Sequence, residues 1–128
     1  MIPQKTIVII TDGTASTRDL AEKIGSEFRE NRVRMIPAED FSGTDILPAD
    51  ICFFGCEKPN PPSFAHLEAV LGHINLAGRP CGLFSPASPE AIEYLSGIVR
   101  DSELALCPKP LFASGAADVA GWIKNIYH

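Results

Sequence analysis

The feature that most constrains this chain is an alternation of short apolar runs with helical patterns. Residues 7–10 are a continuous run of β-branched apolar side chains, which is typical of a strand buried on both faces. From Thr17 onward, apolar residues recur at steps of three and four as far as Phe28, which predicts an amphipathic helix. Strands that alternate with helices predict right-handed crossovers and a parallel sheet with helices on both faces.

The rest of the chain continues this alternation. We predict strands over residues 7–10, 32–37, 50–55, 79–85 and 104–112, and helices over 17–31, 64–76, 88–101 and 115–128. Pro108 and Pro110 interrupt the last strand, so this strand is expected to be short or to lie at a sheet edge. Ser88 can cap the third helix, with Pro89 at its first position. No linker divides these elements, so residues 1–128 are expected to form a single domain.

Charge and cysteine usage exclude several classes of function. The chain has 11 lysine and arginine residues against 16 aspartate and glutamate residues, a net charge of −5. We therefore expect neither a nucleic-acid nor a membrane partner, because both need a basic surface. The N-terminus lacks the features of a signal peptide, so a cytoplasmic protein is expected. The four cysteines form no CxxC pair and have no nearby histidine at ligand spacing, which predicts free thiols and no metal site.

Three loops are expected at the carboxyl ends of the strands, where parallel sheets bind ligands: residues 11–17, 56–63 and 85–88. The first loop offers four hydroxyl groups, Gly13 for backbone freedom and the N-terminus of a helix, a combination that favours an anion. The alternative is that Ser16 or Thr17 only caps that helix. The chain contains neither GxxxxGK[ST], the motif of P-loop nucleotidases, nor GxGxxG, the motif of dinucleotide-binding folds.

The same loop resembles a known family. Val8-Ile9 followed by Ala15-x-Thr17-x-x-x-Ala21-x-x-Ile24 is similar to the flavodoxin signature around the phosphate of FMN. Flavodoxins place an aromatic residue where Ile10 stands and Ser or Thr where Asp12 stands. The segments ADICFFGC, LAGRPCGLFSP and DVAGWIKNI are similar to later flavodoxin elements, so the resemblance covers the whole chain. It implies a three-layer, doubly wound, five-stranded parallel sheet with strand order 2-1-3-4-5.

The resemblance also implies which residues would hold FMN. Thr14 and Thr17 would donate hydroxyl groups to the phosphate, with the backbone N–H groups of Ala15 and Ser16. The second loop would lie along the flavin ring, although it has no Trp or Tyr to stack there, and Glu57 would tune the redox potential. The third loop would contact the ring through its backbone. The expected cofactor site comprises Asp12, Gly13, Thr14, Ala15, Ser16, Thr17, Cys56, Glu57, Lys58, Pro59, Ser85, Pro86, Ala87 and Ser88.

Three functional hypotheses follow. The first is an FMN-binding electron-transfer protein that meets a redox partner protein, and is an electron carrier rather than a catalyst with a substrate of its own. The second is a flavodoxin-like module that has lost flavin and acts as a binding or regulatory domain, which Asp12 and the missing loop aromatics favour. The third is a thiol-dependent enzyme that uses Cys56, although no histidine or acid is paired with it in sequence. We expect His66 and His73 to be surface residues without a catalytic role.

Overall fold

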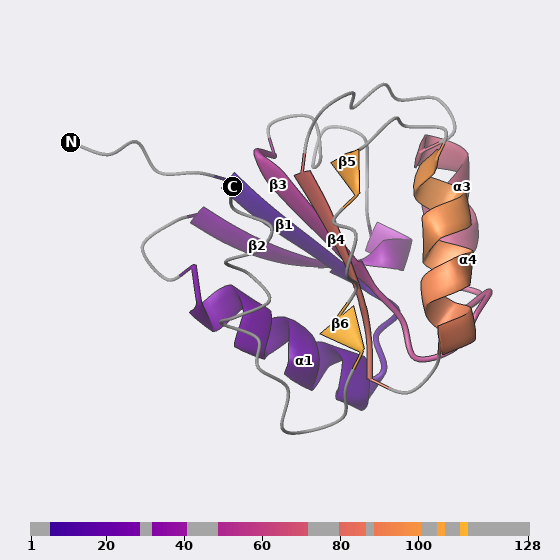
Figure 1. The fold of residues 1–128 in the computed structure, drawn as a ribbon, viewed down its shortest axis with the longest axis horizontal. Helices are drawn as coiled ribbons and strands as arrows, with labels where there is room; N and C mark the ends of the chain where they lie inside the picture. The colour runs from indigo at the N-terminus through magenta and orange to yellow at the C-terminus, as the bar shows by residue number, and fades with distance from the viewer. Residues whose placement is uncertain are drawn as a thin grey trace.

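A parallel sheet forms the centre of the fold (Figure 1). The computed structural model describes residues 6–28, 32–40, 49–71, 80–86, 89–100, 105–106 and 111–112. Within these, the strands lie in the order β2, β1, β3, β4, as the resemblance to flavodoxins implies. Their bounds are β1 Thr6–Thr11, β2 Arg32–Pro37, β3 Ile51–Gly55 and β4 Pro80–Ser85.

Two parts of the predicted fifth strand, 104–112, are among the described residues. Two strands of two residues each pair in parallel with β4: β5, Ala105–Leu106, along its beginning and β6, Leu111–Phe112, along its end. Residues 107–110, between β5 and β6, lie outside the described residues. Both prolines of this stretch lie between β5 and β6 in sequence, and a proline has no N–H group to donate to a sheet.

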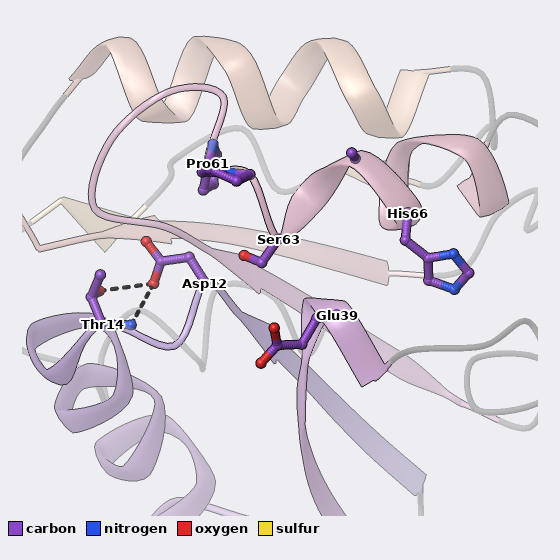
Figure 2. A pocket seen from close by; sticks show the side chains of 8 residues that line it. Asp12, Thr14, Glu39, Pro61, Ser63 and His66 are labelled. Carbon is purple, nitrogen blue, oxygen red and sulfur yellow. Dashed lines mark hydrogen bonds between the residues drawn. The ribbon is translucent and has the colours of Figure 1, made fainter.

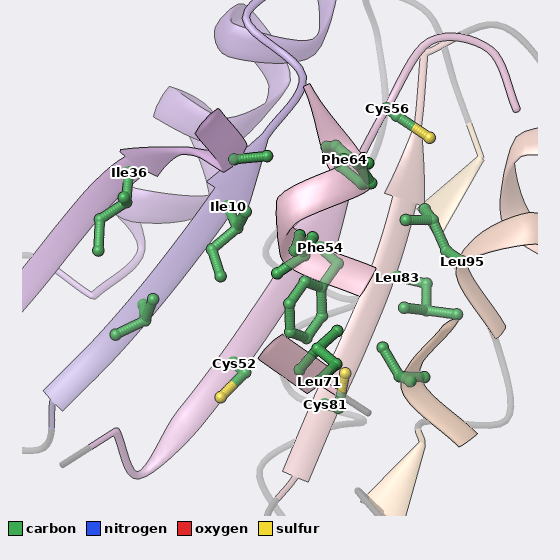
Figure 3. Close-up of a cluster of buried hydrophobic side chains, with 14 of the residues drawn as sticks. Ile10, Ile36, Cys52, Phe54, Cys56, Phe64, Leu71, Cys81, Leu83 and Leu95 are labelled. Atoms are coloured by element: carbon green, nitrogen blue, oxygen red, sulfur yellow. The ribbon is translucent and has the colours of Figure 1, made fainter. Parts of the chain in front are cut away.

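Helices cover both faces of the sheet (Figure 1). α1, Ala15–Ser26, packs against one face in a buried cluster that includes Ile7, Ile9 and Phe53. α3, Phe64–Leu71, and α4, Pro89–Val99, pack against the other face, together with the short 3-10 helix η1, Ala38–Asp40. Figure 3 shows side chains of this second cluster gathered between the sheet and these helices. The predicted helix over 115–128 lies outside the described residues.

Most element boundaries agree with the sequence prediction. All four side chains of residues 7–10 are fully buried, as expected of a central strand, and α4 begins at Pro89. α1 begins two residues earlier than predicted, because the carbonyl of Thr14 already accepts a 3.0 Å hydrogen bond from the backbone N–H of Arg18. No helix within the described ranges is long and apolar enough to span a membrane.

The register of the sheet brings the loops of interest to one edge. Thr11 pairs with Gly55, and Gly55 pairs with Phe84, so β1, β3 and β4 end side by side. The chain therefore leaves all three strands at the same edge, which places loops 11–17 and 56–63 next to each other.

Candidate functional site

The turn between β1 and α1 positions the first site residues. Gly13 has a φ of +86°, a left-handed conformation that L side chains rarely adopt. This turn lets the side chain of Asp12 reach the backbone of the residues that follow it. Thr14 is the N-cap of α1, but its side chain makes no capping hydrogen bond to the helix.

The carboxylate of Asp12 joins two loops, and Figure 2 shows its hydrogen bonds to Thr14 in the first of them. Its Oδ1 accepts hydrogen bonds from the backbone N–H of Thr14 at 3.1 Å and from the Thr14 hydroxyl at 2.8 Å. Its Oδ2 accepts a hydrogen bond from the backbone N–H of Glu57 at 2.8 Å. Asp12 is half-buried, and its side chain faces into the loop cluster. We call this set of three hydrogen bonds the Asp12 clasp.

The two threonines expected to bind a phosphate bond to each other. The hydroxyl oxygens of Thr14 and Thr17 lie 2.7 Å apart, and Thr17 is fully buried. A carboxylate only accepts hydrogen bonds, so Thr14 uses its single hydroxyl proton towards Asp12. The proton between the two threonines therefore comes from Thr17, and both hydroxyl protons are used inside the protein.

A second carboxylate lies at the start of α1. The hydroxyl of Ser16 donates a 2.5 Å hydrogen bond to Oε2 of Glu57. The first turn of α1 contains no acidic residue of its own, so Glu57 supplies from another loop the negative charge that a helix N-terminus favours. Ser16 and Thr17 were the two alternative caps expected from the sequence, but in the described part of the chain neither hydroxyl bonds to the helix backbone. Ser16 binds Glu57 and Thr17 binds Thr14.

The described residues do not fit the phosphate of FMN in this arrangement. Three donors that would serve a phosphate are already used by carboxylates: the N–H and hydroxyl of Thr14 by Asp12, and the hydroxyl of Ser16 by Glu57. Both acceptors carry negative charge at neutral pH, and a phosphate dianion in the same place would be repelled by each of them. The loop has the spacing of a phosphate site, but the carboxylates of Asp12 and Glu57 accept the hydrogen bonds that a phosphate would accept there.

Cys56 has an inert environment. Its side chain is fully buried in the cluster beneath α3 and α4 (Figure 3). Burial, and to a smaller extent the negative charge of Asp12, raise the pKa of the Cys56 thiol to about 12. The thiol is therefore protonated at neutral pH, whereas a nucleophilic cysteine needs a lowered pKa and an accessible sulfur.

Three further predicted site residues line the smaller of two adjoining pockets. Glu57, Lys58 and Pro59 line a pocket of about 300 Å³, which they share with Asp12 and Thr14. Ser85 is fully buried at the end of β4, and Pro86 is half-buried beside it. Ala87 and Ser88 lie outside the described residues. Among the described residues that line the two pockets there is no phenylalanine, tyrosine or tryptophan.

The larger pocket contains residues that the sequence analysis missed. It has a volume of about 630 Å³ and lies beside the Asp12 clasp (Figure 2). Glu39 reaches it from η1, and His66, which is exposed as expected of a surface residue, lines it from the first turn of α3. Only the expected strand order could have indicated Glu39 from the sequence. β2 pairs in parallel with β1, so the residues that follow β2 lie beside the residues that follow β1. The pocket is lined by Asp12, Thr14, Glu39, Pro61, Pro62, Ser63, Ala65 and His66.

Comparison with known proteins shows what this fold is. No protein-family model and no curated protein matches the sequence at a significant level. The structure is similar to a short-chain flavodoxin associated with a PDU bacterial microcompartment, with a TM-score of 0.81 at 9% identity over 97% of both chains. It is similar to flavodoxin 2 from Bacillus cereus, with a TM-score of 0.77 at 16% identity over 94% of this chain and 92% of that one.

A larger protein contains a similar unit. The flavodiiron core of Flv1 from Synechocystis matches with a TM-score of 0.70 at 19% identity, over 95% of this chain and 33% of that one. The chain described here therefore has a flavodoxin-like fold, the fold that the resemblance of its first loop implies.

Proposed function

We propose that this flavodoxin-like chain is a binding module. The crevice between loops 11–17 and 56–63 excludes the phosphate of FMN, because Asp12 and Glu57 place carboxylates where the phosphate would bind. The observation that carries this proposal is the Asp12 clasp, in which Asp12 accepts hydrogen bonds from Thr14 and from the backbone N–H of Glu57. On this proposal the chain acts by binding a ligand or partner, and not by carrying electrons on a flavin.

Electrostatics supports the proposal. A phosphate oxygen about 5 Å from a carboxylate, at an effective dielectric constant near 20, is disfavoured by about 3 kcal/mol per unit charge. Asp12 and Glu57 each contribute such a repulsion at the start of α1. Even one of them is enough to lower the affinity for FMN more than tenfold.

The described lining of the two pockets also offers a flavin ring no aromatic partner. A flavin ring stacks well on aromatic side chains, but neither pocket in the described part of the chain is lined by phenylalanine, tyrosine or tryptophan. Lys58, Pro59 and Asn60 line the smaller pocket instead, and all three are exposed. Stacking therefore offers little to offset the repulsion of the phosphate.

A second candidate function is electron transfer on FMN to a redox partner protein. Two observations favour it: the likeness to flavodoxins over nearly the whole chain, and the spacing of the hydroxyl groups from Thr14 to Thr17. For this function Glu57 would have to leave Ser16, and the phosphate would take its place. The bound flavin would then supply the redox chemistry.

One titration separates the two functions. FMN and riboflavin share the flavin ring and differ in the phosphate, and both lose fluorescence when they bind to flavodoxin-like crevices. We expect the purified chain to leave FMN fluorescence unchanged, and to bind riboflavin no more weakly than FMN. Quenching of FMN with a submicromolar midpoint, together with weaker binding of riboflavin, would overturn the proposal and support electron transfer.

A further inference from the structure

We draw no further inference here: the strongest candidate, the outer edge of strand β2 with the exposed side chains of Arg32 and Met35, carries none because nothing in the structure shows what covers it.

Discussion

The backbone N–H of Glu57 donates a 2.8 Å hydrogen bond to Oδ2 of Asp12, across 45 positions of sequence. This bond ties the loop after β3 to the loop after β1. The other oxygen of the same carboxylate receives the N–H and the hydroxyl of Thr14. One side chain thus satisfies three donors from two loops, and the shape of the crevice depends on it.

The clasp predicts a measurable loss of stability. Asp12→Ala leaves the backbone N–H groups of Thr14 and Glu57 without their acceptor, so we expect the free energy of unfolding to fall by about 1 to 3 kcal/mol. Urea unfolding measures the change. Asp19→Ala, at an exposed position on α1, is the control and should change stability by less than about 0.5 kcal/mol. Equal effects of the two substitutions would contradict a structural role for the clasp.

Removal of both carboxylates should open the crevice to phosphate. The double variant Asp12→Ser, Glu57→Gln keeps the hydroxyls of Thr14 and Ser16 and removes two negative charges. We expect it to bind FMN at least about tenfold more tightly than the unmodified chain, with little change for riboflavin. Asp19→Asn with Glu22→Gln removes the same charge from exposed positions of α1 and should have no such effect. Unchanged FMN binding in the first double variant would show that the carboxylates do not exclude the phosphate.

The sequence predicted the layers of this fold better than its site. Residues 7–10 are apolar and β-branched throughout, and only a strand covered on both faces accommodates them, as β1 confirms. Gly13 was identified for its backbone freedom, and its positive φ confirms that interpretation. These features are local, so they can be recognised in a short stretch of sequence.

The site depends on contacts that leave no local pattern. The partner of Asp12 is the backbone N–H of Glu57, and every residue except proline has such a group, so no residue type could identify it. The position of Glu39 beside Ser63 follows from how η1 and α3 pack on the sheet. The sequence therefore indicated that Asp12 was unusual, and only the structure shows what it binds.

Cys56 predicts a pH dependence of stability. Its thiol pKa is raised from 9.0 to about 12 in the folded chain, chiefly by burial. Above pH 9 the unfolded chain releases this proton while the folded chain keeps it, so stability present below that pH is lost as the pH rises towards 12. The slope contributed by this group is at most about 1.4 kcal/mol per pH unit.

Comparison with Cys56→Ala isolates this contribution. Urea unfolding of both proteins from about pH 7 to about pH 11 gives the difference in their free energies of unfolding. We expect this difference to be constant below pH 9 and to change above it, as the unmodified chain loses stability faster. A difference that stays constant over the whole range would contradict the raised pKa. The cavity that Cys56→Ala leaves lowers the free energy of unfolding by the same amount at every pH, so it does not alter how the difference changes above pH 9.

The unpaired hydroxyl of Ser63 predicts a stabilising substitution. Ser63→Ala removes a buried oxygen that has no partner, so in the absence of ligand the free energy of unfolding should rise by about 1 kcal/mol. Ser26→Ala is the contrasting variant, because its hydroxyl donates a 2.7 Å hydrogen bond to the carbonyl of Lys23. It should leave stability unchanged or slightly lower. A loss of stability in Ser63→Ala would show that the hydroxyl has a partner.

Two glycines predict opposite outcomes of the same substitution. A Cβ atom at Gly55 would lie 2.2 Å from the ring of Phe84, far inside contact distance, whereas a Cβ at Gly97 would meet nothing within 4 Å. Because Phe84 is fully buried, its ring has little room to move, and Gly55→Ala should cost about 1 to 3 kcal/mol.

Gly97→Ala provides the internal control for this pair, because Gly97 is exposed within α4. Alanine is the better helix former by about 0.5 to 1 kcal/mol, so this variant should be more stable than the unmodified chain. Thermal unfolding of both variants measures the two effects with opposite signs. A stable Gly55→Ala variant would mean that β3 and β4 are separated more widely than the contact with Phe84 requires. The Phe84→Leu, Gly55→Ala double variant tests the contact directly, because the smaller side chain should recover part of the loss.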